Sequence, residues 1–209
     1  MNETELRSEI AAERRELAEL LGDLPAGEWD APSLCEGWRI REVAAHITMA
    51  YRYSAPRVIF ELVRSGGSFD RMLDRCARRD AASIPADDLH ASLRDNTTHP
   101  WKPPGGGYAG ALTHDVVHGL DMTIALGLER RVPERRLRVV LEGLASPKGL
   151  KYFGADLDGI ELRADDMDWS FGSGAPVTGA AQDLAMVLCG RRLPAGRLSG
   201  EQSARFAAV

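Results

Sequence analysis

The sequence contains little cysteine, little lysine and no long apolar run, and each shortage excludes a class of protein. Its three cysteines, Cys35, Cys76 and Cys189, are far apart in a chain of 209 residues. They indicate neither a disulfide framework nor a CxxC zinc site, so a reducing, cytoplasmic setting is expected. No apolar run approaches the roughly 20 residues that a membrane-spanning helix needs. The acidic start has no apolar stretch behind it, so we expect no signal peptide and no membrane partner.

Basic charge is also scarce. The chain has 26 basic and 31 acidic residues, a formal net charge of −5 and a pI near 5.6. We therefore expect no nucleic-acid partner, because nucleic-acid-binding proteins carry a clustered basic surplus. Lysine supplies only three of the 26 basic residues, and this arginine bias suggests a GC-rich, actinobacterial coding sequence. With 44% hydrophobic and 27% charged residues, the composition is that of a globular protein.

The spacing of apolar residues predicts a chain of two parts. Helical periodicity predicts helices over residues 5–21, 40–63, 111–126 and 133–144, and weaker helices on the outside over 68–79 and 86–95. Alternation predicts a β-hairpin from residues 160–163 and 169–171, and a short helix follows over 179–189. We therefore expect an α+β protein. Residues 1–130 form a helical bundle in this prediction, and residues 131–209 form a small C-terminal α+β domain.

Three of the five histidines lie within predicted helices. His114 and His118 are four residues apart, so they project from one face with Cβ atoms about 6 Å apart. If the helix of His46 packs beside theirs, His46 supplies a third imidazole across the bundle core. Three imidazoles leave open positions on zinc, nickel or iron(II), which is typical of catalytic metal sites. Asp121 shares the stripe of His114 and His118, and it is the candidate catalytic residue because a carboxylate there can orient a ligating imidazole.

The sequence also allows other interpretations of the same residues. Residues 114–118 read HDVVH, similar to the metallopeptidase motif HExxH, but Asp115 is one methylene shorter than the glutamate base of that motif. The histidines can also be structural hydrogen-bonding residues. Cys35 is expected to be a small buried residue, and Arg191-Arg192 is expected in a solvated turn. The glycines at 105–107 precede a helix but lack the lysine of a phosphate-binding loop.

Several short motifs, taken in order, resemble one family. Residues 34–38 (LCEGW) and 43–47 (VAAHI) resemble the CxGW…VxxH(L/I) signature of the mycothiol-dependent maleylpyruvate isomerase family. Residues 114–127 resemble its second motif, (E/H)xxxHxxD followed by ALG. The tail over residues 169–191 is similar to its C-terminal α/β domain, so the resemblance covers nearly the whole chain. It implies a DinB-like four-helix bundle followed by a small C-terminal α/β domain.

The resemblance also implies a site and a chemistry. In that family, a histidine of the second helix and an (E/H)xxxH pair of a later helix bind a divalent metal, commonly zinc. By position, these residues are His46, His114 and His118. The isomerase has glutamate at the position of His114, so this chain departs from it there and its site is one charge more positive. A metal can hold a thiol as the nucleophilic thiolate, so mycothiol or another low-molecular-weight thiol is the expected cosubstrate.

Three hypotheses follow. The leading one is a cytoplasmic, metal-dependent enzyme, monomeric or homodimeric, that activates a mycothiol-like thiol for isomerisation of, or S-transfer to, a small electrophilic substrate. The second is a metal-binding or small-molecule-binding protein of stress response or regulation without turnover. The third is a helical scaffold whose histidines are structural. Metal analysis separates the third from the others, and thiol-dependent turnover separates the first from the second.

Overall fold

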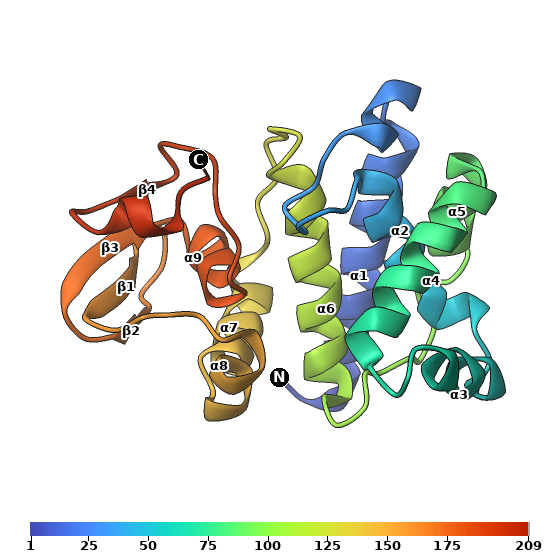
Figure 1. Cartoon of the computed structure of the whole chain (residues 1–209). Coiled ribbons are helices and arrows are strands. Elements are labelled where there is room, and N and C mark those ends of the chain that lie inside the picture. The colour runs from blue at the N-terminus through green and yellow to red at the C-terminus, as the bar shows by residue number, and fades with distance from the viewer. Residues whose placement is uncertain (209) are drawn as a thin grey trace.

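The computed structural model describes residues 1–208, which form a helical part followed by a smaller α+β part (Figure 1). Four helices form a bundle, in which α1 and α2 each pack against both α5 and α6. They are α1 (Glu3–Gly22), α2 (Ile40–Arg52), α5 (Ala86–Arg94) and α6 (Gly107–Thr123). Helix α4 (Phe69–Ser83) packs on α2, and α3 (Ala55–Arg64) packs on α4. The predicted bundle is therefore confirmed.

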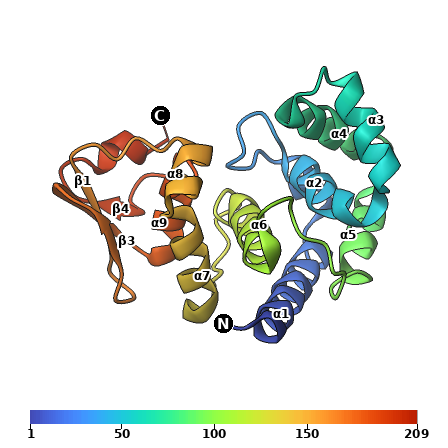
Figure 2. The ribbon, with the colours of Figure 1, turned by 90° about the horizontal axis from the view of Figure 1, so that it is seen from below.

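The second part, as far as residue 208, is a sheet of four strands that packs against helices. Strand β1 (Ile160–Ala164) pairs antiparallel with β2 (Ser170–Gly172), as the hairpin prediction required, and parallel with β3 (Ala175–Gly179). Strand β3 pairs antiparallel with β4 (Leu198–Ser199). Helix α9 (Ala181–Leu188) contacts the sheet and also α7 (Glu134–Leu144) and α6. The sheet and α3 consequently lie toward opposite ends of the molecule (Figure 2).

Short elements complete the fold. They are the 3-10 helices η1 (Ala26–Asp30) and η2 (Ser203–Phe206) and the helix α8 (Pro147–Phe153). Among residues 1–208, none of the helices combines the length and the hydrophobicity that crossing a membrane requires.

One hydrophobic core joins the two parts. Leu112, Val116 and Leu120 of α6 are fully buried and belong to the same cluster as Leu162 of β1 and Leu184 of α9. A second cluster fills the space between α1, α2 and α5. Helix α6 is therefore central, and side chains on it are held by packing on several sides. The division of the chain near residue 130 stays a prediction, because the first core crosses it.

A buried arginine also ties α7 to α1. Arg136 is 2% exposed and forms ion pairs with Glu9, Glu13 and Glu16 at 2.7–2.8 Å. A guanidinium has five N–H donors, so one arginine can satisfy several carboxylates of the neighbouring helix. This contact holds the first helix of the C-terminal part against the first helix of the bundle.

Two expectations about the helices were wrong. The helix predicted over 40–63 is interrupted, because Tyr53 is extended and Pro56 starts a new helix, α3, in its first turn. Proline has no backbone N–H to donate to the carbonyl of Arg52 four residues earlier, and its ring would clash with that carbonyl, so α2 cannot continue through Pro56. Helix α5, expected on the outside, belongs to the bundle, and its Leu89 and Leu93 are fully buried.

Candidate metal centre

The structure brings His46, His114 and His118 together in the bundle. One ring nitrogen from each lies within 4.8 Å of the others. The Nε2 atoms of His46 and His114 are 3.1 Å apart. The two-histidine stripe of α6 faces α2 because the two helices pack directly against each other. The cluster that the sequence spacing predicted is therefore present, and we call it the histidine triad.

In both histidines of α6, a carboxylate contacts the ring nitrogen Nδ1. Nδ1 of His114 lies 2.9 Å from Oδ1 of Asp115, and Nδ1 of His118 lies 3.0 Å from Oδ2 of Asp121. A carboxylate accepts the hydrogen, so both Nδ1 atoms are donors and both Nε2 atoms keep a lone pair. This is the arrangement in which outer carboxylates orient metal-ligating histidines.

The triad offers the ligand atoms that a cation requires. Carboxylates hold the α6 rings with Nε2 unprotonated, and Nε2 of His46 faces Nε2 of His114 at 3.1 Å, so either one proton or one metal ion can lie between these two atoms. Nδ1 of His46 is buried and has no hydrogen-bond partner among the described residues. Three imidazole nitrogens suit zinc, nickel and iron(II).

Burial lowers the pKa of two imidazoles of the triad, those of His46 and His118. His46 is 9% exposed, and burial together with the neighbouring imidazoles of His118 and His114 holds its pKa well below the usual value. Burial also lowers the pKa of His118, although the nearby Asp121 carboxylate opposes the shift. Neutral imidazole is the form that binds a metal.

Asp121 sits in a buried network that reaches the C-terminal part of the chain. Arg191 donates from Nε to Oδ1 at 2.8 Å and from Nη2 to Oδ2 at 3.1 Å. The Cys35 thiol donates to Oδ2 at 2.9 Å. The expectation that Arg191 lies in a solvated turn was therefore wrong, because the turn after α9 packs against α6 and directs this side chain inward.

Cys35 is buried, as expected, and its surroundings do not favour a nucleophile. Burial, with the Asp121 charge beside it, raises the pKa of the thiol. Cys35, His118 and Asp121 form a second cluster with metal-ligating atoms. Arg191 already donates to the sulfur and to the carboxylate of that cluster, so a cation there would meet a guanidinium.

Sequence reasoning missed the two indoles beside the triad. The ring of Trp38 lies 5.2 Å from that of His46, and the ring of Trp101 lies 4.9 Å from that of His114. Trp38 belongs to the LCEGW motif and so carried a signal. Trp101 comes from the loop before α6, and nothing in its spacing pointed to the triad.

Asp115 is held too firmly to serve as the base of a peptidase. Its two oxygens accept from His114 and from Arg14, and its side chain is 1% exposed. A general base must have a free lone pair facing the water that it activates. The geometry therefore disfavours the HExxH-like interpretation.

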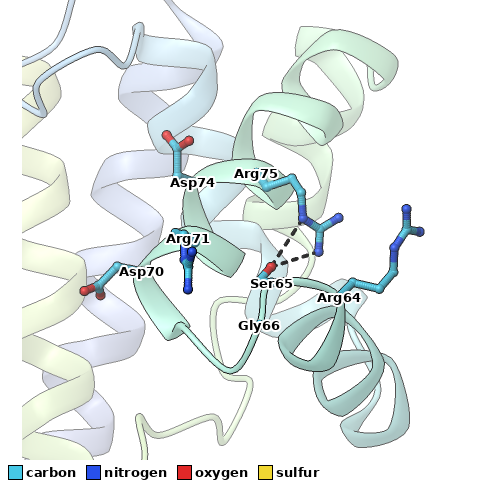
Figure 3. A pocket seen from close by; sticks show the side chains of 7 residues that line it. All are labelled: Arg64, Ser65, Gly66, Asp70, Arg71, Asp74 and Arg75. Carbon is cyan, nitrogen blue, oxygen red and sulfur yellow. Dashed lines mark hydrogen bonds between the residues drawn. The ribbon is translucent and has the colours of Figure 1, made fainter.

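Other candidate features lie apart from the triad. The ring of His99 lies tilted against that of Tyr51, with the ring centres 5.1 Å apart, and the ring of His90 lies against Gly22. An open hollow of about 750 Å³ lies where α3 meets α4 (Figure 3). None of the predicted site residues lines this hollow, and its side chains carry both positive and negative charges. The lining residues are Arg64, Ser65, Gly66, Asp70, Arg71, Asp74 and Arg75.

Comparison with known proteins supports the same family as the motifs. Residues 10–99 match the family model of the mycothiol maleylpyruvate isomerase N-terminal domain. This range includes His46 but ends before His114 and His118. No protein of curated function matches the chain in sequence.

Solved structures share the fold over the whole length. The crystal structure of the mycothiol-dependent maleylpyruvate isomerase superposes with a TM-score of 0.64 at 14% identity, over 97% of this chain and 94% of that one. A histidine-to-alanine mutant of that isomerase superposes with a TM-score of 0.62 at 13% identity, with the same coverage. The predicted resemblance to the mycothiol-dependent maleylpyruvate isomerase family is therefore confirmed over residues 10–99, and the α+β fold is shared with these solved structures over nearly the whole chain.

Proposed function

We propose that this protein is a metal-dependent enzyme that activates a low-molecular-weight thiol, mycothiol where the host makes it. The thiol would act on a small electrophilic substrate, either in isomerisation through a reversible adduct or in S-transfer. The family relationship supports a thiol-dependent isomerase, and the histidine triad supports the metal. His46, His114 and His118 would hold the metal, zinc first and nickel or iron(II) as alternatives.

One observation carries the proposal. Two carboxylates hold Nδ1 of His114 and His118, so that both Nε2 lone pairs are available beside His46. Preset orientation of this kind is what distinguishes a ligand set from histidines that pack in a core. A divalent metal bound there would supply Lewis acidity that lowers the pKa of a thiol or water.

The surrounding residues would prepare the site for an anionic thiolate. Imidazoles that bind a metal are neutral, and each nearby carboxylate is matched by a guanidinium, Asp115 by Arg14 and Asp121 by Arg191. No net negative charge of the protein then opposes a thiolate. Trp38 and Trp101 cover two sides of the triad and exclude water from them, which strengthens electrostatic interactions inside.

The alternative function is metal binding without turnover. The side chains of His114 and His118 are only 16% and 14% exposed, and His46 is 9% exposed. Such limited access favours a site that holds a metal but leaves little room for a thiol as large as mycothiol. Thiol-dependent turnover decides between the two functions.

Metal analysis tests the triad. Protein purified without a histidine tag should carry about one divalent metal per chain, since one set of three imidazoles makes one site. His46→Ala, His114→Ala and His118→Ala should each lose most of it. His90→Ala, a histidine outside the triad, is the matched control and should keep it. Full metal content in the triple alanine variant would show that the metal site is elsewhere.

Cobalt substitution tests the thiol. The cobalt protein should gain a sulfur-to-metal charge-transfer band when mycothiol is added, and binding should release about one proton per thiol. Both signals should vanish in His118→Ala. If neither mycothiol nor the common cellular thiols at millimolar concentration produce them, the thiol mechanism fails and the binding function is supported.

A further inference from the structure

We propose that Asp115 and Arg14 form a positioning couple that fixes the tautomer of His114. In this couple, Asp115 sets which ring nitrogen carries the proton, and Arg14 sets which carboxylate oxygen Asp115 presents. The inference rests on the proposed function only for the statement that His114 is a metal ligand. The protonation of the ring can be measured in the metal-free protein.

The geometry assigns one oxygen of Asp115 to each neighbour. Oδ1 accepts from Nδ1 of His114 at 2.9 Å, and Oδ2 accepts from Nε of Arg14 at 2.7 Å. The side chains of Asp115 and Arg14 are both 1% exposed. Water therefore does not compete for either oxygen, and the carboxylate has no reason to turn.

Arg14 is itself fixed from the other side. Its Nη1 donates to the carbonyl oxygen of His99 at 2.7 Å. Its guanidinium lies 5.3 Å from the centre of the Tyr51 ring. The chain of contacts thus runs from the loop before α6, through an arginine of α1 and a carboxylate of α6, to one ring of the triad.

Stability alone does not explain this couple. A fully buried ion pair can often be replaced by apolar residues of similar volume with no loss of stability, because burying two charges is costly. The carboxylate also contacts the ring next to it, whose Nε2 faces His46 at 3.1 Å. Holding Nδ1 protonated leaves Nε2 free to bind a metal, and that is a role that an apolar pair cannot perform.

An amide in place of the carboxylate separates the roles of the two residues. In Asp115→Asn, Nε–H of Arg14 still requires an oxygen, so the amide oxygen turns to Arg14 and the NH₂ group faces Nδ1 of His114. Two donors cannot face each other, so the ring moves its proton to Nε2 and loses its ligand lone pair. In Arg14→Met/Asp115→Asn the arginine no longer dictates the orientation. The amide can then turn its oxygen to Nδ1 and restore the original tautomer.

The first measurement is metal affinity by chelator competition with zinc. Asp115→Asn should weaken zinc binding by about 10–100-fold, as loss of an outer partner does. The double variant Arg14→Met/Asp115→Asn should bind more tightly than Asp115→Asn, although it is changed at one more position. Asp80→Asn is the matched control, because Asp80 is a buried carboxylate that pairs with Arg52 and forms no hydrogen bond to a histidine of the triad, and its zinc affinity should stay at the wild-type value.

The second measurement is the tautomer of His114 in the metal-free protein, read from ring ¹⁵N chemical shifts. Wild type and the double variant should carry the proton on Nδ1, and Asp115→Asn should carry it on Nε2. If wild type binds no zinc, the proposed function fails while the tautomers still decide the present inference. A ring in Asp115→Asn that keeps its proton on Nδ1, or equal zinc affinity in the single and double variants, overturns the couple.

A third variant keeps the test decisive if Asp115→Asn does not fold. Arg14→Met/Asp115→Leu replaces the buried pair with apolar side chains and leaves Nδ1 of His114 without an acceptor. It should bind zinc about tenfold or more weakly than Arg14→Met/Asp115→Asn, whose amide oxygen can accept that hydrogen. Equal zinc affinity in these two folded proteins would refute the role of the acceptor.

Discussion

Replacing Arg191 with methionine should destabilise the metal-free protein at neutral pH. The guanidinium makes two hydrogen bonds to Asp121, whose side chain is 0% exposed. Removing one partner of a buried ion pair costs about 3–5 kcal/mol, because the other charge stays buried without compensation. Here His118 and Cys35 still donate to the carboxylate, and Arg191 is 22% exposed so water can partly replace it. We therefore expect a loss of about 2–4 kcal/mol of unfolding free energy.

The loss should depend on pH in a definite direction. Burial alone would raise the pKa of Asp121, but hydrogen bonds from His118 and Arg191 and the charge of Arg191 hold it well below its usual value. A lowered folded-state pKa contributes stability above the unfolded pKa of about 3.9, and this contribution disappears as the pH falls. In Arg191→Met the pKa of Asp121 rises, so its carboxyl takes up a proton more readily and needs no cation once protonated. The unfolded state is the same in both proteins, so the difference in stability between wild type and variant should shrink as the pH falls below the raised pKa of Asp121 in the variant.

Urea unfolding with a metal chelator present, at pH 7 and at pH 3.5, measures both effects. Arg192→Met is the matched control, because the neighbouring arginine is exposed and donates only to backbone carbonyls at 3.3 Å. It should cost less than about 0.5 kcal/mol. If Arg191→Met and Arg192→Met are equally stable at pH 7, the buried pair with Asp121 does not support the fold as argued.

The remaining predictions concern the helices and the triad. Two arginines of α4 lower the pKa of Glu61 to about 2, so its carboxylate stabilises the folded state above its unfolded pKa of about 4.3 and loses this effect as the pH falls toward 2. Unfolding curves of wild type and Glu61→Gln should differ at pH 7 and converge near pH 2. Gly119→Ala should destabilise by about 1–3 kcal/mol through overpacking, because its Cβ would lie 2.7 Å from a methyl carbon of the buried Leu17. Gly143 lies near the end of α7, and a Cβ added there would have its closest neighbour at 3.7 Å. Gly143→Ala should therefore stabilise the protein by about 0.5 kcal/mol. Equal thermal stability of the two alanine variants would contradict both predictions. Asp121→Asn should weaken metal binding by about 10–100-fold in chelator competition and leave the circular dichroism unchanged, and unchanged affinity would leave Asp121 a purely structural role.

The triad was predictable because its signal is local. The spacing of His114 and His118 places them on one face of any helix, and packing of the helix that carries His46 beside theirs needed only a bundle. The contact of Asp121 with His118 follows from the same helical period. Whether these residues bind a metal stays a prediction. Fold class was predictable for the same reason, since amphipathic periods and one alternating hairpin define the two parts.

The parts of the site that spacing could not predict depend on distant or unusual contacts. Arg191 is 70 positions from Asp121, and no period in the sequence links the turn after α9 to α6. Asp115 directly follows His114, and adjacent helical residues do not normally face each other, so its contact depends on side-chain rotamers. The break in the helix predicted over 40–63 did have a signal in Pro56, and the periodicity on either side of it concealed the break.

The charged side chains around the triad matter for the position at which this chain differs from the isomerase, His114. The resemblance implies that the isomerase places a glutamate where this chain has His114, so that protein brings one negative charge into contact with its metal. Here the carboxylates Asp115 and Asp121 lie behind the histidines, at Nδ1, and each is matched by an arginine. A divalent cation among the three imidazoles would therefore keep its full charge. Such a centre lowers the pKa of a bound thiol or water more than a centre with an anionic ligand does. Under the proposed function, the histidine at position 114 would favour the activation of weakly acidic thiols, and this advantage would depend on the positioning role proposed for Asp115.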